Sequence, residues 1–228
     1  MAGGRKRREL RAIIRQGRLL ARAAGRTPPR VTGERVAVFV HGYMAGGAVF
    51  DPLRARVERE LGISTVDFSY GPLDSFDAVL TRFAAHVEAA LPEGAQVSLV
   101  GHSLGGILAR AFLHEHPGGA AVDQLLTIAT PHAGTRAVRF LPVGPATALK
   151  PGSAVLSRLE QHRGKRPDVT RVALIAGADT LCSPVASAGE LPGAEVHHVD
   201  GVGHNEVIFD ERVHDLITHH LGRPLRGK

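Results

Sequence analysis

The chain has 228 residues, of which 43% are hydrophobic, and a formal net charge of +6 at pH 7. This length accommodates one domain with a full core, and the hydrophobic content excludes a chain that is disordered throughout. No apolar run reaches the length of a transmembrane helix, and Cys182, the single cysteine, excludes an internal disulfide.

The basic residues are concentrated in an N-terminal arm, residues 1–30. Ten Arg or Lys side chains against Glu9 give the arm a net charge of +9, which leaves −3 for residues 31–228. The domain formed by residues 31–228 therefore lacks the basic character expected of a nucleic-acid-binding domain. The arm also lacks the apolar region and cleavage site of a signal peptide, so we expect a cytoplasmic protein.

The arm has apolar side chains at helical spacing. They share one face of a helix over residues 5–24, with arginines on the other face, and are Leu10, Ile13, Ile14, Leu20, Ala21 and Ala24. The pattern predicts a helix that packs on the domain or frays from it. Two alternatives are a surface anchor that contacts an anionic membrane through residues 5–24 and an arm that binds nucleic acid. Thr27-Pro28-Pro29 predicts a linker.

Six segments of the domain are predicted to be strands. They cover residues 36–40, 64–68, 96–100, 122–129, 171–176 and 195–199. Helical patterns over residues 48–61, 75–91, 107–116 and 209–221 alternate with them. The order predicts an α/β fold with a doubly wound, mostly parallel six-stranded sheet. Residues 136–168 are rich in Pro and Gly, contain a possible helix over 154–161, and are expected to form a small cap or lid.

The stretch Gly101-His102-Ser103-Leu104-Gly105 follows one of these strands and precedes a helical pattern. The Gly-x-Ser-x-Gly sequence is the signature of a nucleophile elbow, a strained strand-to-helix turn that exposes the serine. The residues two before and two after the serine must be small, and Gly101 and Gly105 meet that need. The alternative is a glycine-rich turn with no catalytic role.

Two further residues complete the group that acyl transfer requires. Among 13 histidines, His204 alone lies in a glycine-flanked loop after the last strand, which suits a general base. Asp179 follows the preceding strand and suits the acid that orients the base. Asp200 is its rival, although it would share one short loop with His204. Loops at the carboxyl ends of parallel strands build the site in such folds, and all these residues follow a predicted strand.

These motifs resemble the α/β-hydrolase superfamily, and within it bacterial triacylglycerol lipases and esterases. The residues that carry the resemblance are His41-Gly42-Tyr43, Gly101-His102-Ser103-Leu104-Gly105, Thr130-Pro131-His132-Ala133-Gly134-Thr135, Ala178-Asp179 and Gly201-Val202-Gly203-His204. The resemblance implies that the backbone N–H groups of Tyr43 and Leu104 form the oxyanion hole. It also implies substrate contacts from His41, Gly42, Met44, His102, Pro131 and His132.

The expected function is a serine hydrolase that cleaves acylglycerols or simpler esters through an acyl-enzyme on Ser103. One alternative is a deacylase or thioesterase acting on a membrane lipid or an acyl thioester, and another is a non-catalytic hydrolase-like binding protein. We expect no cofactor, no metal site, no nucleic acid partner, and an arm that catalysis does not require. Neighbouring histidines, as in His197-His198 and His219-His220, do not point at a shared ion.

Overall fold

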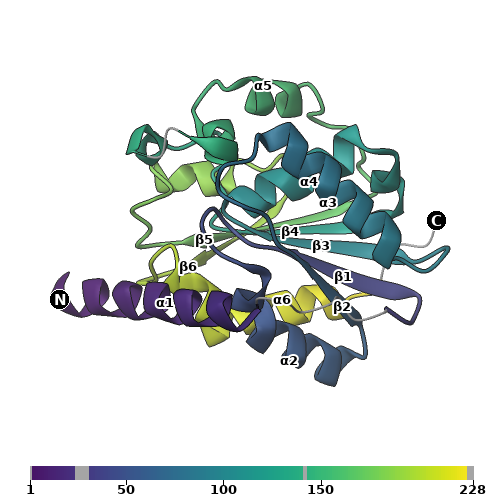
Figure 1. Ribbon diagram of the computed structural model, residues 1–228, viewed down its shortest axis with the longest axis horizontal. Coiled ribbons are helices and arrows are strands. Elements are labelled where there is room, and N and C mark those ends of the chain that lie inside the picture. Colours follow the sequence, from purple (N-terminus) through teal and green to yellow (C-terminus); the bar gives the residue numbers. More distant parts are fainter. Residues whose placement is uncertain (1, 24–30, 141–142, 225–228) are drawn as a thin grey trace.

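The computed structural model describes residues 2–23, 31–140 and 143–224, and its centre is a parallel sheet of six strands (Figure 1). The strands are β1 (Arg35–Val40), β2 (Ser64–Phe68), β3 (Gln96–His102), β4 (Val122–Ile128), β5 (Thr170–Ala176) and β6 (Glu195–Val199). They lie in the order β2-β1-β3-β4-β5-β6, so the chain reverses its direction across the sheet between β1 and β3. Ligands bind at such a switch point, outside the carboxyl ends of the strands.

Helices cover both faces of this sheet. Figure 1 shows α3 (Phe76–Ala90) and α4 (Leu104–Glu115) on one face, with α2 (Asp51–Leu61) and α6 (Glu211–Gly222) on the other. Each face has its own apolar cluster, because a strand covered on both sides buries its alternate side chains in opposite directions. Phe83 and Phe112 pack in the first cluster, and Phe50 and Leu53 pack in the second.

The helices begin and end where the local sequence favours it. The Ser75 hydroxyl accepts the backbone N–H of Ala78 at the start of α3, and the Asp210 carboxylate accepts that of Arg212 at the start of α6. Such N-caps satisfy N–H groups that lack a partner within the helix. Pro117 follows α4 closely, as expected for a residue that cannot continue a helix.

The six predicted strands and the alternation with helices are confirmed. The helix after β3 was predicted too late, because α4 begins at Leu104, directly after Ser103, rather than at residue 107. The helix predicted over residues 48–61 is divided into a 3-10 turn, η1 (Gly47–Phe50), and α2. None of the helices in the described part of the chain has the length and apolar content needed to span a bilayer.

The segment expected to be a cap forms short helices that pack on the α3 and α4 side. They are η3 (Arg136–Phe140), η4 (Gly144–Leu149) and α5 (Ala154–Glu160). Ala146, Leu149 and Leu159 join the apolar cluster of that face. The described part of this segment is therefore continuous with the core. Further short turns that the sequence did not indicate are η2 (Pro117–Ala121), η5 (Val185–Gly189) and η6 (Glu206–Phe209).

The N-terminal arm forms a helix, α1 (Ala2–Ala23), as predicted, but with a different face against the domain. Ala12 and Gln16 are buried, whereas Leu10, Ile13 and Ile14 are 57%, 49% and 47% exposed. The expectation that the apolar face packs on the domain is wrong for these residues. The predicted linker at 27–29 lies outside the described residues.

Candidate active site

The turn at Ser103 is tight because α4 approaches the sheet very closely. Ser103 has φ 53° and ψ −122°, a backbone conformation that residues other than glycine rarely adopt. A Cβ added at Gly105 would overlap the carbonyl oxygen of Val40 in β1, and one at Gly101 would lie 2.5 Å from the Gly106 backbone. These close contacts are the physical reason for the small residues predicted on both sides of Ser103.

Ser103, His204 and Asp179 form one hydrogen-bonded chain, although they come from three different loops. The Ser103 hydroxyl lies 2.9 Å from His204 Nε2, and His204 Nδ1 lies 2.6 Å from Asp179 Oδ2. All three side chains are buried. The serine therefore donates to the imidazole, and the imidazole donates to the carboxylate.

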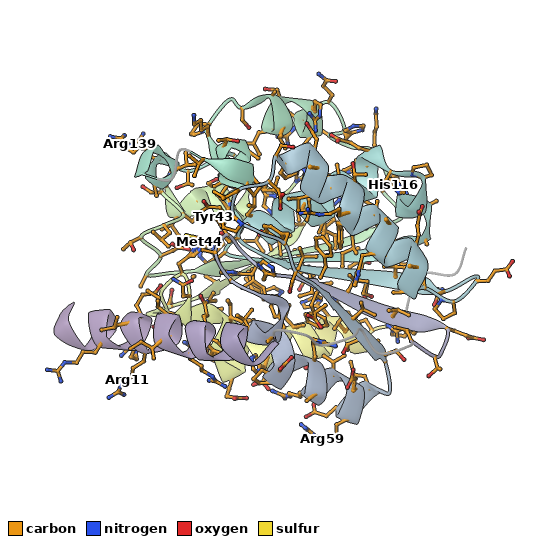
Figure 2. The ribbon with its side chains drawn as sticks, in the orientation of Figure 1. Arg11, Tyr43, Met44, Arg59, His116 and Arg139 are labelled. Carbon is orange, nitrogen blue, oxygen red and sulfur yellow. The ribbon has the colours of Figure 1, made fainter. Side chains whose placement is uncertain are left out.

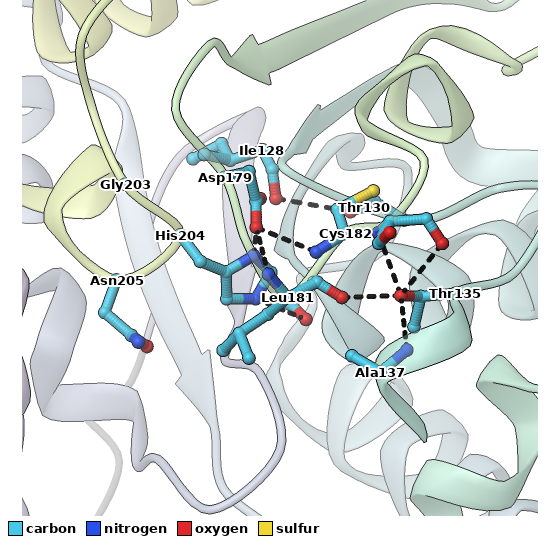
Figure 3. A network of polar contacts seen from close by, with 12 residues as sticks. Ile128, Thr130, Thr135, Ala137, Asp179, Leu181, Cys182, Gly203, His204 and Asn205 are labelled. Carbon is cyan, nitrogen blue, oxygen red and sulfur yellow. Dashed lines mark hydrogen bonds and ion pairs between the residues drawn. The ribbon is translucent and has the colours of Figure 1, made fainter. Parts of the chain in front are cut away.

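The Asp179 carboxylate is held on both of its oxygens (Figure 3). Oδ1 accepts the backbone N–H groups of Leu181 and Cys182, each at 2.7 Å, while Oδ2 faces His204. A buried carboxylate is costly unless such donors compensate its charge. Asp200, the rival candidate, is exposed, and the structure does not bring its carboxylate to His204.

The His102 ring lies next to the His204 ring and forms a hydrogen bond to the main chain of His204. His102 Nε2 donates to the carbonyl oxygen of His204 at 2.9 Å, and the two ring centroids are 4.8 Å apart. Burial is the main reason why the pKa of His102 lies well below its ordinary value, and the nearby His204 lowers it further. A neutral ring in this tautomer keeps its N–H on the His204 carbonyl.

Solved structures of other proteins share this arrangement of sheet and helices. The lipase BlEst2 of Bacillus licheniformis in its mature form aligns with a TM-score of 0.63 at 16% identity, over 85% of this chain and 94% of that one. EstE1, a carboxylesterase from a metagenomic library, aligns with a TM-score of 0.62 at 16% identity, over 99% and 98%. The chain has the α/β-hydrolase fold.

Sequence comparison adds a partial match. A family described as PGAP1-like alpha/beta domain matches residues 75–140 of this α/β-hydrolase fold, which include α3, the Ser103 turn and β4. No protein of curated function matches the sequence. The carboxyl esterase 2 of Tuber melanosporum is a further structural neighbour, with a TM-score of 0.57 at 18% identity over 84% of this chain and 79% of that one.

A small cleft of about 80 Å³ opens beside Ser103. Of the residues expected to contact substrate, Gly42, His102 and Pro131 line it, as does Tyr43 from the expected oxyanion hole. The sequence missed the other side of the cleft, which is formed by Thr135, Ala137, Val138, Leu149, Leu181 and Asn205. Most of these residues are apolar; Ala137, Val138 and Leu149 belong to the segment expected to be a cap, and Thr135 belongs to the motif at 130–135.

Three expected substrate contacts are not at the cleft. The His41 ring is fully buried and stacks on Tyr70, whose backbone N–H donates to His41 Nε2 at 3.1 Å. His132 is also buried, with Nε2 3.1 Å from the Thr127 hydroxyl. Met44 is 67% exposed and does not line the cleft (Figure 2). A sequence shows which loop a side chain belongs to, but not the direction in which it points.

Thr135 joins two loops that border the cleft, as Figure 3 shows. Its hydroxyl donates to the carbonyl oxygen of Leu181 at 2.5 Å and accepts the backbone N–H groups of Ser183 at 2.9 Å and Ala137 at 3.2 Å. Cys182, between these partners, is fully buried, and burial raises the pKa of its thiol to about 12.

Helix α1 binds directly to the loop that carries His204. One oxygen of Glu9 accepts both the backbone N–H of Asn205, at 2.9 Å, and its side-chain amide, at 2.7 Å. The other oxygen accepts the backbone N–H of Glu206 at 3.2 Å, and Arg8 donates to the Glu206 carboxylate at 2.7 Å. The arm therefore contacts the loop that carries His204, which the sequence did not indicate, and the expectation that catalysis does not require the arm stays a prediction.

The structure also brings together one histidine from each pair that the sequence analysis had considered for a metal. His197 Nε2 lies 3.0 Å from His220 Nε2 and 3.1 Å from Glu195 Oε1. Arg223 Nη1 lies 3.0 Å from Glu195 Oε2 and 3.2 Å from His220 Nδ1. The Arg223 guanidinium thus contacts both Glu195 and His220. The expectation that the protein binds no metal stays a prediction.

Proposed function

We propose that this protein is a carboxylic ester hydrolase that forms its acyl-enzyme on Ser103. The observation that carries the proposal is the hydrogen-bonded chain from Ser103 through His204 to Asp179. In this mechanism the Ser103 hydroxyl attacks the ester carbonyl while His204 takes its proton. His204 then delivers that proton to the leaving alcohol. Water repeats the two steps on the acyl-enzyme, releases the acid and regenerates Ser103.

Two backbone N–H groups would stabilise the negative charge that develops on the carbonyl oxygen. Leu104 is the first residue of α4, where N–H groups have no partner within the helix. Tyr43 lines the cleft beside Ser103. One donor from the start of α4 and one from the Tyr43 loop would therefore hold the oxyanion beside Ser103. This mechanism needs no cofactor.

The substrate class follows from the cleft and from α1. Val138, Leu149 and Leu181 provide apolar contacts for an acyl chain beside Ser103. The neighbours called lipase and carboxylesterase support an acylglycerol or a simpler acyl ester as substrate. The exposed Leu10, Ile13 and Ile14 favour a second candidate, deacylation of a lipid that stays in its membrane. An intact hydrogen-bonded chain disfavours a non-catalytic binding protein.

Removal of the nucleophile tests the proposal. Ser103→Ala should lower kcat on p-nitrophenyl esters by about 10⁴ to 10⁶, because the three residues act as a unit. It should also abolish labelling by a fluorophosphonate probe. Ser157→Ala, a change at an exposed serine of α5, is the matched control and should keep both. Activity that survives in Ser103→Ala would contradict the mechanism.

The two candidate acids give distinct results. Asp179→Asn should lower kcat by about 10⁴, because the His204 ring loses the charge that orients it. Asp200→Asn should leave kcat close to that of the unchanged protein, since its carboxylate does not reach His204. Steady-state kinetics on a soluble ester measure both. The reverse outcome would exchange the roles of the two residues.

The Glu9 contacts predict that α1 positions His204. Glu9→Ala should lower kcat on a soluble ester about tenfold with little change in KM, because displacement of a catalytic group slows the chemical step. Glu9→Gln keeps one acceptor oxygen and should recover part of the rate. Arg11→Gln, at an exposed position of the same helix, is the control. Full activity in Glu9→Ala would show that the domain holds the loop without α1.

We also propose that α1 docks on an anionic membrane, since it combines exposed Leu10, Ile13 and Ile14 with the +9 charge of residues 1–30. Vesicles containing phosphatidylglycerol should bind the protein, and added salt should weaken binding, because each basic residue near the surface contributes roughly 1 kcal/mol that ions screen. A variant with serine at these three positions should bind less than Leu73→Ser, a control at another exposed leucine. No binding at low salt would contradict docking.

A further inference from the structure

A second, larger cavity lies at the opposite edge of the sheet from Ser103. Its volume is about 920 Å³, more than ten times that of the cleft beside Ser103. It is bordered by the amino ends of β5 and β6, the last turns of α4, the loop after α5 and the end of α6. Cavities of this size hold small organic ligands.

Positive charges dominate the lining of this cavity. The basic side chains are Arg110, Arg163, Lys165, Arg171 and Arg223, joined by His114 and His162. Among the described residues that line it, Glu195 is the one acid, and it pairs with Arg223 at 3.0 Å. The rest of the domain has a net negative charge, so this concentration is local.

Arg110 is the most deeply buried of these cations. Its side chain is 3% exposed, its Nη2 donates to the carbonyl oxygen of Leu159 at 3.1 Å, and Glu160 is 3.9 Å away. Its Nε is buried with no hydrogen-bond partner among the described residues. A buried donor without an acceptor costs free energy, so an acceptor supplied from the cavity would be stabilising.

Arg171 is held by two backbone carbonyl oxygens, and Asp168 is the acid whose charge acts on it. Its guanidinium donates to the carbonyl oxygens of Val169, at 3.1 Å, and Lys165, at 2.9 Å. These contacts aim the group without neutralising it. Burial lowers the pKa of Arg171, and burial lowers the pKa of Arg110 to about 10.

The pKa of His114 reflects the positive charges that surround it. His114 lies one turn after Arg110 on α4, and its ring stacks on that of His162 at a centroid distance of 5.1 Å. Burial, first, and the positive charges of Arg171, His162 and Arg110 lower its pKa to about 4. Acids of the chain balance part of this charge, since Glu160 pairs with Arg163 and Glu195 pairs with Arg223.

We propose that this cavity binds a small organic ligand through one or more phosphate groups. Phosphate carries more negative charge than a carboxylate and offers more acceptor oxygens, which suits several converging Arg and Lys donors. The phosphate accepts from Arg110, Arg171 and Lys165, and the remaining volume holds the organic part. The site is separate from the proposed site of ester hydrolysis, because no described residue that lines this cavity also lines the cleft beside Ser103.

Inorganic pyrophosphate is the probe that tests this site. Isothermal titration at constant ionic strength should show saturable one-to-one binding, and NMR should show the pKa of His114 rising as pyrophosphate offsets the positive charges. Lys165→Gln, at an exposed position, should weaken binding about tenfold, the scale of one charge-assisted hydrogen bond. Arg110→Gln should weaken it further, provided that its circular dichroism matches the unchanged protein.

Lys150→Gln is the matched control, since Lys150 is exposed and does not line the cavity. Absence of saturable binding, or equal weakening by Lys150→Gln and Lys165→Gln, would overturn the proposal. Ser103→Ala should bind pyrophosphate normally, which separates this result from that of the ester hydrolase proposal. The source of the phosphate is tested in a protein whose Leu10, Ile13 and Ile14 are serine. If Lys165→Gln removes the vesicle binding that remains in this protein, the source is a lipid headgroup. Unchanged vesicle binding identifies a soluble ligand.

Discussion

The close approach of α4 to β1 and β3 is the constraint on which the site depends. The Gly105 backbone rests against the carbonyl oxygen of Val40, and Gly101 rests against Gly106, so any side chain there would push the helix outward. This contact forces the chain to reverse within one residue, and Ser103 takes the strained conformation at that point. The packing of the two apolar clusters supplies the free energy that holds the strain. Displacement of α4 would relax Ser103 and move its hydroxyl away from His204.

The same close packing keeps Ser103, His204 and Asp179 within hydrogen-bond distance of one another. Asp179 is buried, and two backbone N–H groups and the imidazole of His204 surround its carboxylate. His102 adds a donor to the His204 carbonyl from the turn itself. The residue next to Ser103 therefore positions the main chain of His204. His102 also lines the cleft, so the substrate contact that the resemblance implies for it stays a prediction.

The sequence predicted most of the fold because buried strands and their turns leave a strong local pattern. The central strand β1 is apolar on both faces, and the glycines around Ser103 meet a local steric need. The resemblance between motifs placed Ser103, Asp179 and His204 in loops that the sheet then brings together. The directions of His41 and His132 could not be predicted, since a ring may turn to either side of its loop and only packing selects one. The cationic cavity also left no signal, because its residues come from α4, β5 and the loop after α5, far apart in the chain.

The largest difference between the sequence-based expectations and the structure concerns α1, where two physical effects favour different orientations of the helix. Burial of Leu10, Ile13 and Ile14 would gain hydrophobic free energy, and on that ground alone these residues should face the domain. The loop after His204 instead exposes backbone N–H groups, and Glu9 and Gln16 meet it with hydrogen-bonding side chains. Glu9 and Leu10 are adjacent, so a helix that turns Glu9 inward must turn Leu10 away by about 100°. The apolar surface of α1 and the support of the His204 loop are therefore fixed together, and any rotation of this helix changes both.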